Sequence, residues 1–276
     1  MEKNITIVDI AKKTGLSVAT VSRALNGHPS VKEETRKKVE DTAEKLGYQV
    51  NYLARSLGAS SGNMIGMLIP DIRTPFYGRI FSVCEQRALK RGYVLALCNS
   101  FNSLKLETHF YKQLLAQHAC GIVQIGGSLD RQMIPPQLYS QIKSTAEKIP
   151  VITSVPVKNT DCRCIYVDNT RSMRTLLEYL IGLGHRRIAF VGGRSDVWST
   201  MEKRRTYSEV LKERGIAHEI ICEGSYGKED GYFAVKSLLR RGEDFTAVIA
   251  ITDTCAMGVI QALSENGLQC GKDISV

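Results

Sequence analysis

The sequence predicts an N-terminal all-α headpiece with a helix-turn-helix, followed by an α/β core of two doubly wound subdomains. Within the first 48 residues, apolar positions recur at spacings of three and four, as they do on helices. From residue 63 onward, short apolar runs alternate with helical patterns, which is typical of parallel sheets covered by helices. The expected parts are 1–48 for the headpiece, 49–62 for a hinge helix or linker, and 63–161 and 162–276 for the two subdomains.

The sequence predicts both ends of the first helix. Thr6 is expected to cap its N-terminus, with Asp9 at the third helical position completing a capping box. Gly15 supplies the left-handed residue that ends the helix, and Ser17 caps the next one. Two short helices joined by a tight glycine turn are a common way to present a helix to the DNA major groove.

The second helix is expected to have a buried and an exposed face. Val21, Ala24 and Leu25 form the buried stripe, and the opposite stripe consists of Val18, Ala19, Ser22 and Arg23. A third helix is expected to start at Ser30 with the capping box Ser30-Val-Lys-Glu33. It would bury Val39, Ala43 and Leu46. Spacing alone also allows an ordinary three-helix bundle with no DNA partner.

The residues themselves favour DNA binding, because the segment resembles the headpiece of the LacI/GalR family of bacterial repressors. The motifs that carry this resemblance are Val8-Asp-Ile-Ala11, Gly15-Leu-Ser17, Thr20-Val-Ser-Arg23, Leu25-Asn-Gly27, Val31, Thr35-Arg36, Val39, Leu46-Gly-Tyr48 and Asn51-Tyr-Leu-Ala-Arg-Ser-Leu57. They follow one another in order over about the first sixty residues, a stretch of domain scale. Where the family usually has a proline before the hinge, this chain has Gln49-Val50, which loosens the expected turn.

The resemblance implies a set of DNA contacts in the headpiece and the hinge. The expected contact residues are Thr6, Ser17, Val18, Ala19, Thr20, Ser22, Arg23, Asn26, Val31, Thr35, Asn51, Ala54 and Leu57. Arg23 is the one suited to a bidentate bond with guanine, whereas Val18 and Ala19 suit thymine methyl groups. In this family the hinge becomes helical only on operator DNA, where a leucine at the position of Leu57 wedges into the minor groove. Without DNA, the same segment is expected to be a flexible linker.

The core is expected to hold seven strands and six helices. The strands are 64–69, 93–98, 121–125, 151–154, 164–167, 188–191 and 247–251, and the helices are 81–91, 107–117, 170–183, 203–214, 230–241 and 255–266. This core resembles the type I periplasmic-binding-protein fold that the LacI/GalR family uses for its effectors. The matching motifs are Val167-Asp-Asn169, Gly184-His-Arg-Arg-Ile-Ala189 and Asp253-Thr-Cys-Ala-Met-Gly258.

Ligands of open α/β sheets bind beyond the carboxyl ends of the strands, here in a cleft between the subdomains. The expected effector contacts are Phe76, Tyr77, Asp168, Thr200, Arg204, Tyr226, Thr252 and Asp253. Phe76 and Tyr226 offer flat faces to a sugar or base, and Arg204 offers a fork to hydroxyls, a carboxylate or a phosphate. Asp253 suits ligand hydroxyls or the N-cap of the last helix. The resemblance implies a sugar or sugar phosphate first, and a purine or nucleoside second.

Composition limits the remaining classes. The net charge of +9 suits an acidic partner, although basic residues at 185–187, 194 and 203–205 are expected on solvated surface. No apolar run reaches about 18 residues, and the Met-Glu-Lys-Asn start resembles no signal peptide. We therefore expect no membrane contact and a location in the bacterial cytoplasm, at the nucleoid. Eight cysteines are then expected to be reduced thiols, with no metal and no cofactor.

The expected function is that of a homodimeric repressor which binds operator double-stranded DNA under the control of a small-molecule effector and serves a carbohydrate-related operon. An enzyme is not expected, because the sequence has no nucleophile–base pair, phosphate loop or metal cluster. A solute-binding protein is the alternative from another class, but it explains neither the headpiece nor the missing leader. The chain stops at Val276, where the family continues into another strand, so we expect a C-terminal truncation and weak effector binding.

Overall fold

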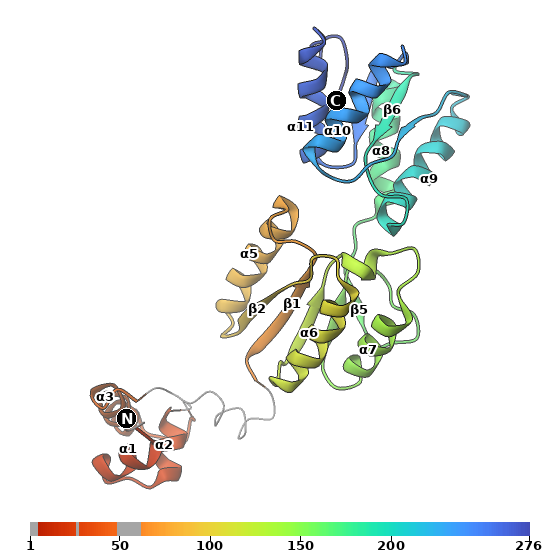
Figure 1. The fold of residues 1–276 in the computed structure, drawn as a ribbon. Coiled ribbons are helices and arrows are strands. Elements are labelled where there is room, and N and C mark those ends of the chain that lie inside the picture. The colour runs from red at the N-terminus through yellow and green to blue at the C-terminus, as the bar shows by residue number, and fades with distance from the viewer. Residues whose placement is uncertain (1–4, 26–27, 49–61) are drawn as a thin grey trace. The chain divides into compact units, whose positions relative to one another are not determined.

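The computed structural model describes residues 5–25, 28–48 and 62–276. Contacts between Cα atoms divide the chain into two compact units, Met1–Gly62 and Asn63–Val276. In the described residues of the first unit, three helices follow one another: α1 (Ile7–Thr14), α2 (Val18–Leu25) and α3 (Glu33–Lys45) (Figure 1). Each contributes a side chain with no exposed surface to one small core, namely Ile10, Val21 and Val39. The expected buried stripe of α2 is therefore confirmed, with Ala24 buried and Leu25 packed at the edge.

The expected capping box at Ser30 is wrong. The backbone is still extended at Lys32 (φ −60°, ψ 144°), and the helix begins only at Glu33. The Ser30 hydroxyl lies 2.8 Å from Nδ1 of His28. A local hydrogen bond between neighbouring loop residues thus replaces the cap, which is a common alternative for serine.

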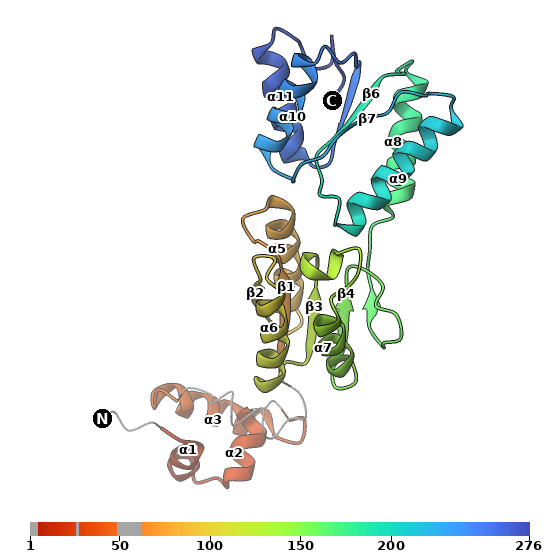
Figure 2. The same ribbon diagram turned by 45° about the vertical axis from the view of Figure 1, so that its right-hand side comes forward.

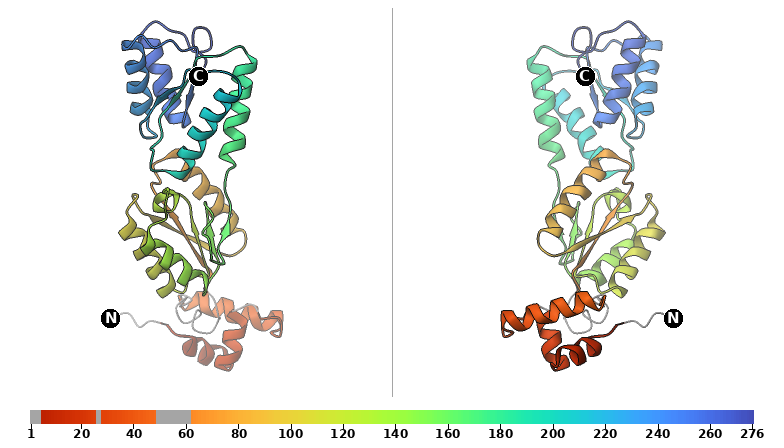
Figure 3. Two further views of the ribbon diagram at one scale, coloured as in Figure 1. Left: turned by 90° about the vertical axis from the view of Figure 1, so that its right-hand side faces the viewer. Right: turned by 90° about the vertical axis from the view of Figure 1, so that its left-hand side faces the viewer.

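The first half of the second unit contains a parallel sheet in the order β2-β1-β3-β4-β5. Its strands are β1 (Met64–Ile69), β2 (Val94–Asn99), β3 (Gly121–Gln124), β4 (Val151–Thr153) and β5 (Arg163–Cys164). Helices α6 (Leu104–Ala116) and α7 (Pro136–Ala146) cover one face, and α5 (Pro75–Leu89) lies on the other (Figures 2 and 3). A short 3-10 helix, η1 (Gly127–Asp130), follows β3.

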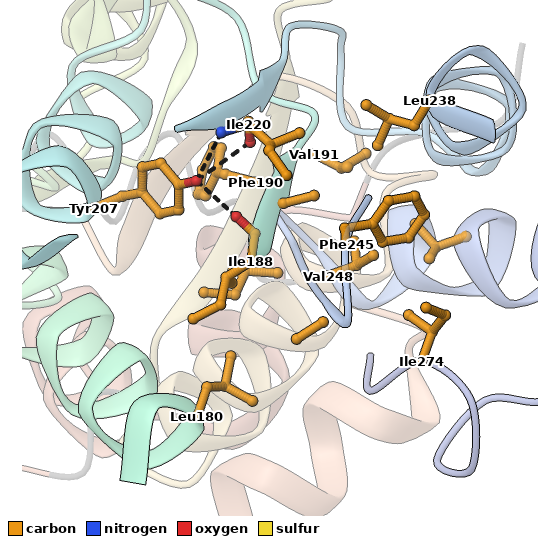
Figure 4. Packing of buried hydrophobic residues seen from close by; sticks show 14 of the residues in the cluster. Leu180, Ile188, Phe190, Val191, Tyr207, Ile220, Leu238, Phe245, Val248 and Ile274 are labelled. Carbon is orange, nitrogen blue, oxygen red and sulfur yellow. Dashed lines mark hydrogen bonds between the residues drawn. The ribbon is translucent and has the colours of Figure 1, made fainter. Parts of the chain in front are cut away.

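The second half contains a parallel sheet in the order β7-β6-β8, formed by β6 (Ile188–Val191), β7 (Ile220–Cys222) and β8 (Ala247–Ala250). Helices α8 (Asn169–Gly182) and α9 (Trp198–Glu213) cover one face, and α10 (Lys228–Arg240) and α11 (Asp253–Glu265) cover the other (Figure 2). All four residues of β6 are buried, as expected for a central strand with helices on both faces. The buried Tyr207 hydroxyl donates to Ile188 O (2.7 Å) and accepts from Ile220 N (3.0 Å), which joins the starts of β6 and β7 (Figure 4).

The structure corrects several expected elements. Residues 163–164 pair with β4, so the strand expected at 164–167 is limited to Arg163–Cys164 and belongs to the first sheet. Helix α5 begins at Pro75 and not at 81, because proline suits the first helical position. Helix α9 likewise begins at Trp198 and not at 203. Helix α7 and strand β7 were not expected at all.

Candidate functional sites

The turn between α1 and α2 is held by local hydrogen bonds. The Thr6 amide and hydroxyl both donate to Oδ2 of Asp9, at 2.9 and 2.6 Å. Gly15 is left-handed (φ 72°) and its N–H bonds to the Ala11 carbonyl. Ser17 Oγ accepts from the Thr20 amide at 3.1 Å, which is the expected N-cap of α2. These bonds set the start of the second helix relative to the first.

The face of α2 opposite the core is open to solvent. Val18 is 43% exposed, and Ala19 and Arg23 are also exposed. No hydrogen bond or ion pair engages the Arg23 guanidinium within the described headpiece, so its five donors are available to a partner. Small apolar side chains beside one free guanidinium can approach the edges of bases closely, with the arginine supplying a two-point contact to guanine.

The other expected DNA contacts fall into three groups. The hydroxyls of Ser17 and Thr20 lie 2.8 Å apart, and the Thr6 hydroxyl is bonded to Asp9, so each already has a protein partner. Val31, Thr35 and Ser22 are half-buried, and Val31 packs against the headpiece core. The positions that lie outside the described residues are Asn26, Asn51, Ala54 and Leu57.

In the second sheet, the carboxyl ends of all three strands are tied through Tyr226. Its hydroxyl lies 3.0 Å from Oγ1 of the fully buried Thr200, which belongs to the helix after β6. Its carbonyl accepts from the Thr252 hydroxyl (2.9 Å) beyond β8. Burial raises the pKa of Tyr226, so the phenol stays protonated and can donate. Three of the expected effector residues thus come together at one edge of the sheet.

Arg204 has a different surrounding from the one expected. One terminal nitrogen donates to Glu223 Oε1 (2.6 Å), and the other donates to the carbonyls of Gly192 (3.3 Å) and Gly193 (2.6 Å). The side chain keeps only 12% of its surface exposed. Its guanidinium is therefore engaged by the loops that follow β6 and β7, so in this structure Arg204 positions these loops.

Asp168 and Asp253 lie at helix starts. Asp168 caps α8, where its carboxylate accepts from the Arg171 amide at 2.8 Å. The expected N-cap role of Asp253 is wrong, because Thr252 is the cap and accepts from the Cys255 amide at 3.1 Å. Asp253 is the exposed first residue of α11, and its carboxylate is open to solvent.

Phe76 and Tyr77 lie in the first turn of α5, not in a loop. Phe76 is 56% exposed, and the two rings meet edge to face with centroids 5.1 Å apart. Burial raises the pKa of the Tyr77 phenol, and the negative charge of Asp130 raises it further. A side-chain carbon on Gly126 would collide with the Tyr77 hydroxyl, so the loop after β3 passes directly under this ring.

Two charged residues outside the expected effector set, Asp130 and Lys203, lie between the halves of the second unit. Asp130, at the end of η1, accepts from the Ser199 hydroxyl of α9 at 2.8 Å. Burial raises the pKa of Asp130 and lowers that of Lys203, and the two groups interact electrostatically. Neither Asp130 nor Lys203 belongs to a recognisable sequence motif. The two residues come close together only because the first and second subdomains are in contact in the folded chain. A surface depression of about 520 Å³ between β7 and α10 contains none of the eight expected effector residues.

Four arginines of the basic stretches at 185–187, 194 and 203–205 are paired with acids. Arg187 pairs with Asp244, Arg194 with Asp196, Arg204 with Glu223 and Arg205 with Glu209. Exposed pairs of this kind contribute little to stability, and they also neutralise the local charge.

Comparison with protein families identifies the chain. Residues 6–51 match the family described as bacterial regulatory proteins, lacI family, and residues 62–276 match periplasmic binding proteins and sugar binding domain of LacI family. The chain belongs to the LacI family. Members are DNA-binding transcriptional regulators and not enzymes, so this chain is such a regulator and the enzyme class is excluded.

Individual LacI-family relatives match along nearly the whole chain. Catabolite control protein A of Priestia megaterium is 32% identical over 99% of this chain and 81% of its own. The regulator GalR of Escherichia coli is 30% identical over 98% and 78%. The structure of the lac repressor dimer bound to operator and the anti-inducer ONPF superposes with a TM-score of 0.85, at 25% identity, over 99% of this chain and 82% of that one.

These matches confirm the resemblance inferred from the motifs, and they confirm the fold class of a helical headpiece with a periplasmic-binding-protein-like core. The α/β core of this LacI-family chain contains no helix long and apolar enough to cross a membrane, and neither do the described parts of its headpiece. No group of three metal-ligating side chains was found in the same described ranges.

Proposed function

We propose that this chain is a homodimeric repressor that binds operator DNA through α2 and is controlled by a sugar-type effector held between its two α/β subdomains. We divide it into a headpiece (1–48), a hinge (49–62) and two subdomains, with the boundary between the subdomains after Cys164, where the first sheet ends. Its place of action would be the cytoplasm, at the nucleoid, because its target is chromosomal DNA.

The observation that carries the DNA role is the exposed face of α2. Small side chains flank Arg23, whose guanidinium has no partner among the described headpiece residues, and the helix start is fixed by bonds to Ser17. The hydroxyls of Thr6, Ser17 and Thr20 already have hydrogen-bond partners inside the headpiece. Each can form only a single further hydrogen bond, which suits a DNA phosphate better than the edge of a base. The lac repressor structure, solved on its operator, supports this use of the fold.

A gel-shift experiment with the DNA upstream of the chain's own gene tests this role. Ala19→Glu places a carboxylate on the exposed face of α2 and should abolish the shift, because it meets the base edges and phosphates with a negative charge. Ala217→Glu makes the same change at an exposed position in the second unit and should leave the shift unaltered. If both variants lost the gel shift equally, or if neither variant lost it, the assignment of α2 as the DNA-binding helix would be refuted.

For the hinge, we propose that residues 51–57 become helical on DNA and that Leu57 enters the minor groove. The segment is too short for a stable isolated helix, since such helices are marginal below about 12 residues. Leu57→Ala should reduce DNA bending, measured by circular-permutation gel shift, more than it changes half-site preference. A bend equal to that of the wild type would contradict the wedge.

For the effector, the strongest support is the cluster of Thr200, Tyr226 and Thr252 at the strand ends of the second sheet. A half-buried phenol that two threonine hydroxyls hold in place suits a ligand rich in hydroxyl groups. Phe76 and Tyr77 would supply aromatic faces from the first subdomain. Among similar structures, the regulator CelR was solved with cellobiose, which is in keeping with a sugar.

For the dimer, α10 and α11 pack against each other and expose large apolar side chains. Phe233 is 64% exposed, Met257 63% and Ile260 42%. Apolar groups gathered on one pair of helices mark an interface more often than a free surface. Met257→Glu should convert the dimer into a monomer in sedimentation experiments, whereas Met133→Glu, at a residue 81% exposed, should not.

A further inference from the structure

The carboxylate of Asp130 is only half satisfied. Its Oδ2 accepts from the Ser199 hydroxyl at 2.8 Å. Its Oδ1 is buried and has no donor in the described part of the chain. A buried acceptor without a donor costs stability, so proteins rarely keep one unless something else satisfies it.

The fold holds Asp130 firmly in this place. Gly126 and Gly127, both left-handed at φ 71° and 72°, turn the chain after β3. The Gly126 amide donates to Ser154 Oγ (3.0 Å), and the Ser128 amide donates to the buried Glu107 carboxylate (2.9 Å). The loop that carries Asp130 is thus fixed on two sides, and the position of its free oxygen does not depend on a mobile backbone.

The same loop joins the two halves of the second unit. Directly after Asp130, Arg131 forms an antiparallel bridge with Val197, and the Gln132 amide donates to the Asp196 carbonyl at 3.1 Å. Asp130 therefore lies where the two subdomains meet. It interacts electrostatically with Tyr77 of the first subdomain and with Tyr226 of the second, which both belong to the expected effector set.

The charges around Asp130 disfavour an anionic ligand. A carboxylate only accepts hydrogen bonds, as does a fully ionised phosphate, so the two repel and cannot pair. Of the cations of this region, Lys203 is opposed by Asp130 and Arg194 by Asp196, and the exposed Arg131 also interacts electrostatically with Asp196. A hydroxyl group, in contrast, can donate to Oδ1 without bringing any charge.

We propose that Asp130 is an effector-binding residue whose free oxygen accepts a ligand hydroxyl and selects a neutral sugar over its phosphate ester. This inference rests on the proposed effector site between the subdomains and narrows its ligand class. Because Oδ2 stays bonded to Ser199, the ligand would be held by the first subdomain at a point already linked to the second.

The test uses the 276-residue chain and a panel of probes: glucose, galactose, ribose and cellobiose, with glucose 6-phosphate, galactose 1-phosphate and ribose 5-phosphate, and the bases guanine and hypoxanthine. Thermal shift finds binders, and calorimetric titration measures Kd. A neutral sugar should bind more tightly than its own phosphate ester. Asp130→Ala should weaken that sugar at least about tenfold, as expected for a lost hydrogen bond to a charged group.

Asp130→Asn and Asp196→Asn complete the design. Asp130→Asn keeps the shape but removes the charge, so it should narrow the gap between the sugar and its phosphate ester. Asp196→Asn removes an exposed carboxylate from the neighbouring loop and should change the Kd less than about twofold. A comparison of the two variants therefore distinguishes the loss of a direct hydrogen bond to the ligand from the general effect of removing one negative charge near the site.

Several outcomes would overturn the proposal. They are a phosphate ester that binds as tightly as its parent sugar, an Asp130→Ala protein with unchanged Kd, and no binding by any sugar. Binding of guanine or hypoxanthine but of no sugar would also overturn the proposal for Asp130, although it would still support an effector site between the subdomains. The gel shift on the same preparation reports separately on the DNA role.

Discussion

Removing one oxygen atom from Tyr207 should destabilise the second α/β subdomain by about 2–3 kcal/mol. The Tyr207 side chain has no exposed surface, and its burial raises the pKa of the phenol to about 12. The hydroxyl donates to the Ile188 carbonyl and accepts from the Ile220 amide. Tyr207→Phe keeps the ring and its packing but removes both bonds.

The magnitude follows from these two contacts. A buried hydrogen bond contributes about 1 kcal/mol net, and a buried donor left without a partner costs about 1–3 kcal/mol. The loss of one oxygen creates almost no cavity, so little is added for packing. For a unit as large as Asn63–Val276, 1 kcal/mol shifts the melting temperature by about 2–4 °C, so the expected fall is about 4–12 °C.

Urea unfolding followed by circular dichroism, together with thermal melts, would measure the change. Tyr179→Phe is the matched control, because Tyr179 is 65% exposed on α8 and its change should stay within about 0.5 kcal/mol. If the two variants had equal stability, the hydroxyl of Tyr207 would not join β6 to β7, and the reasoning would fail.

Three further predictions concern other parts of the chain. Gly258→Ala would drive a methyl group into the Lys228 carbonyl where α10 meets α11, so we expect the free energy of unfolding in urea to fall by about 3 kcal/mol or more. Gly182→Ala, which has open space around the new methyl group, should raise the free energy of unfolding by up to about 1 kcal/mol. Arg23→Ala should relax the preference at one base pair per half-site by about 1–3 kcal/mol in a binding-site selection, and an unchanged motif would disprove the guanine contact. Burial raises the pKa of Glu107, so the native state holds its proton more tightly than the unfolded chain, and stability should fall as pH rises from the ordinary glutamate range through the raised value. Glu107→Gln should flatten this part of the curve of melting temperature against pH, and a slope equal to that of the wild type would contradict the assignment.

Sequence patterns predicted the elements whose information is local. The bounds of β1 and β6 agree with the prediction because each is a continuous apolar run. The capping box of Thr6 and Asp9 and the cap at Ser17 were predictable because each involves residues three apart.

Elements with weak local patterns escaped prediction. Strand β7 has three residues, which is too short for any periodicity to show. Helix α7 is largely polar, although Pro136 at its first position and the spacing of Leu138 and Ile142 could have indicated it. At the site, the roles of Arg204 and Asp130 depend on partners 11 to 69 positions away, so no local pattern contains them.

The position of Tyr226 has a consequence for how this regulator could acquire a new ligand. The residue that would face the effector also joins the ends of the second sheet's strands through Thr200 and Thr252. Most exchanges of the tyrosine would therefore loosen the sheet edge at the same time as they altered recognition. Phe76 does not join strands in this way, because its side chain is largely exposed at the start of α5. If Phe76 and Tyr226 do face the effector, changes of effector specificity should therefore arise first in the first subdomain, where they leave the sheet edge intact.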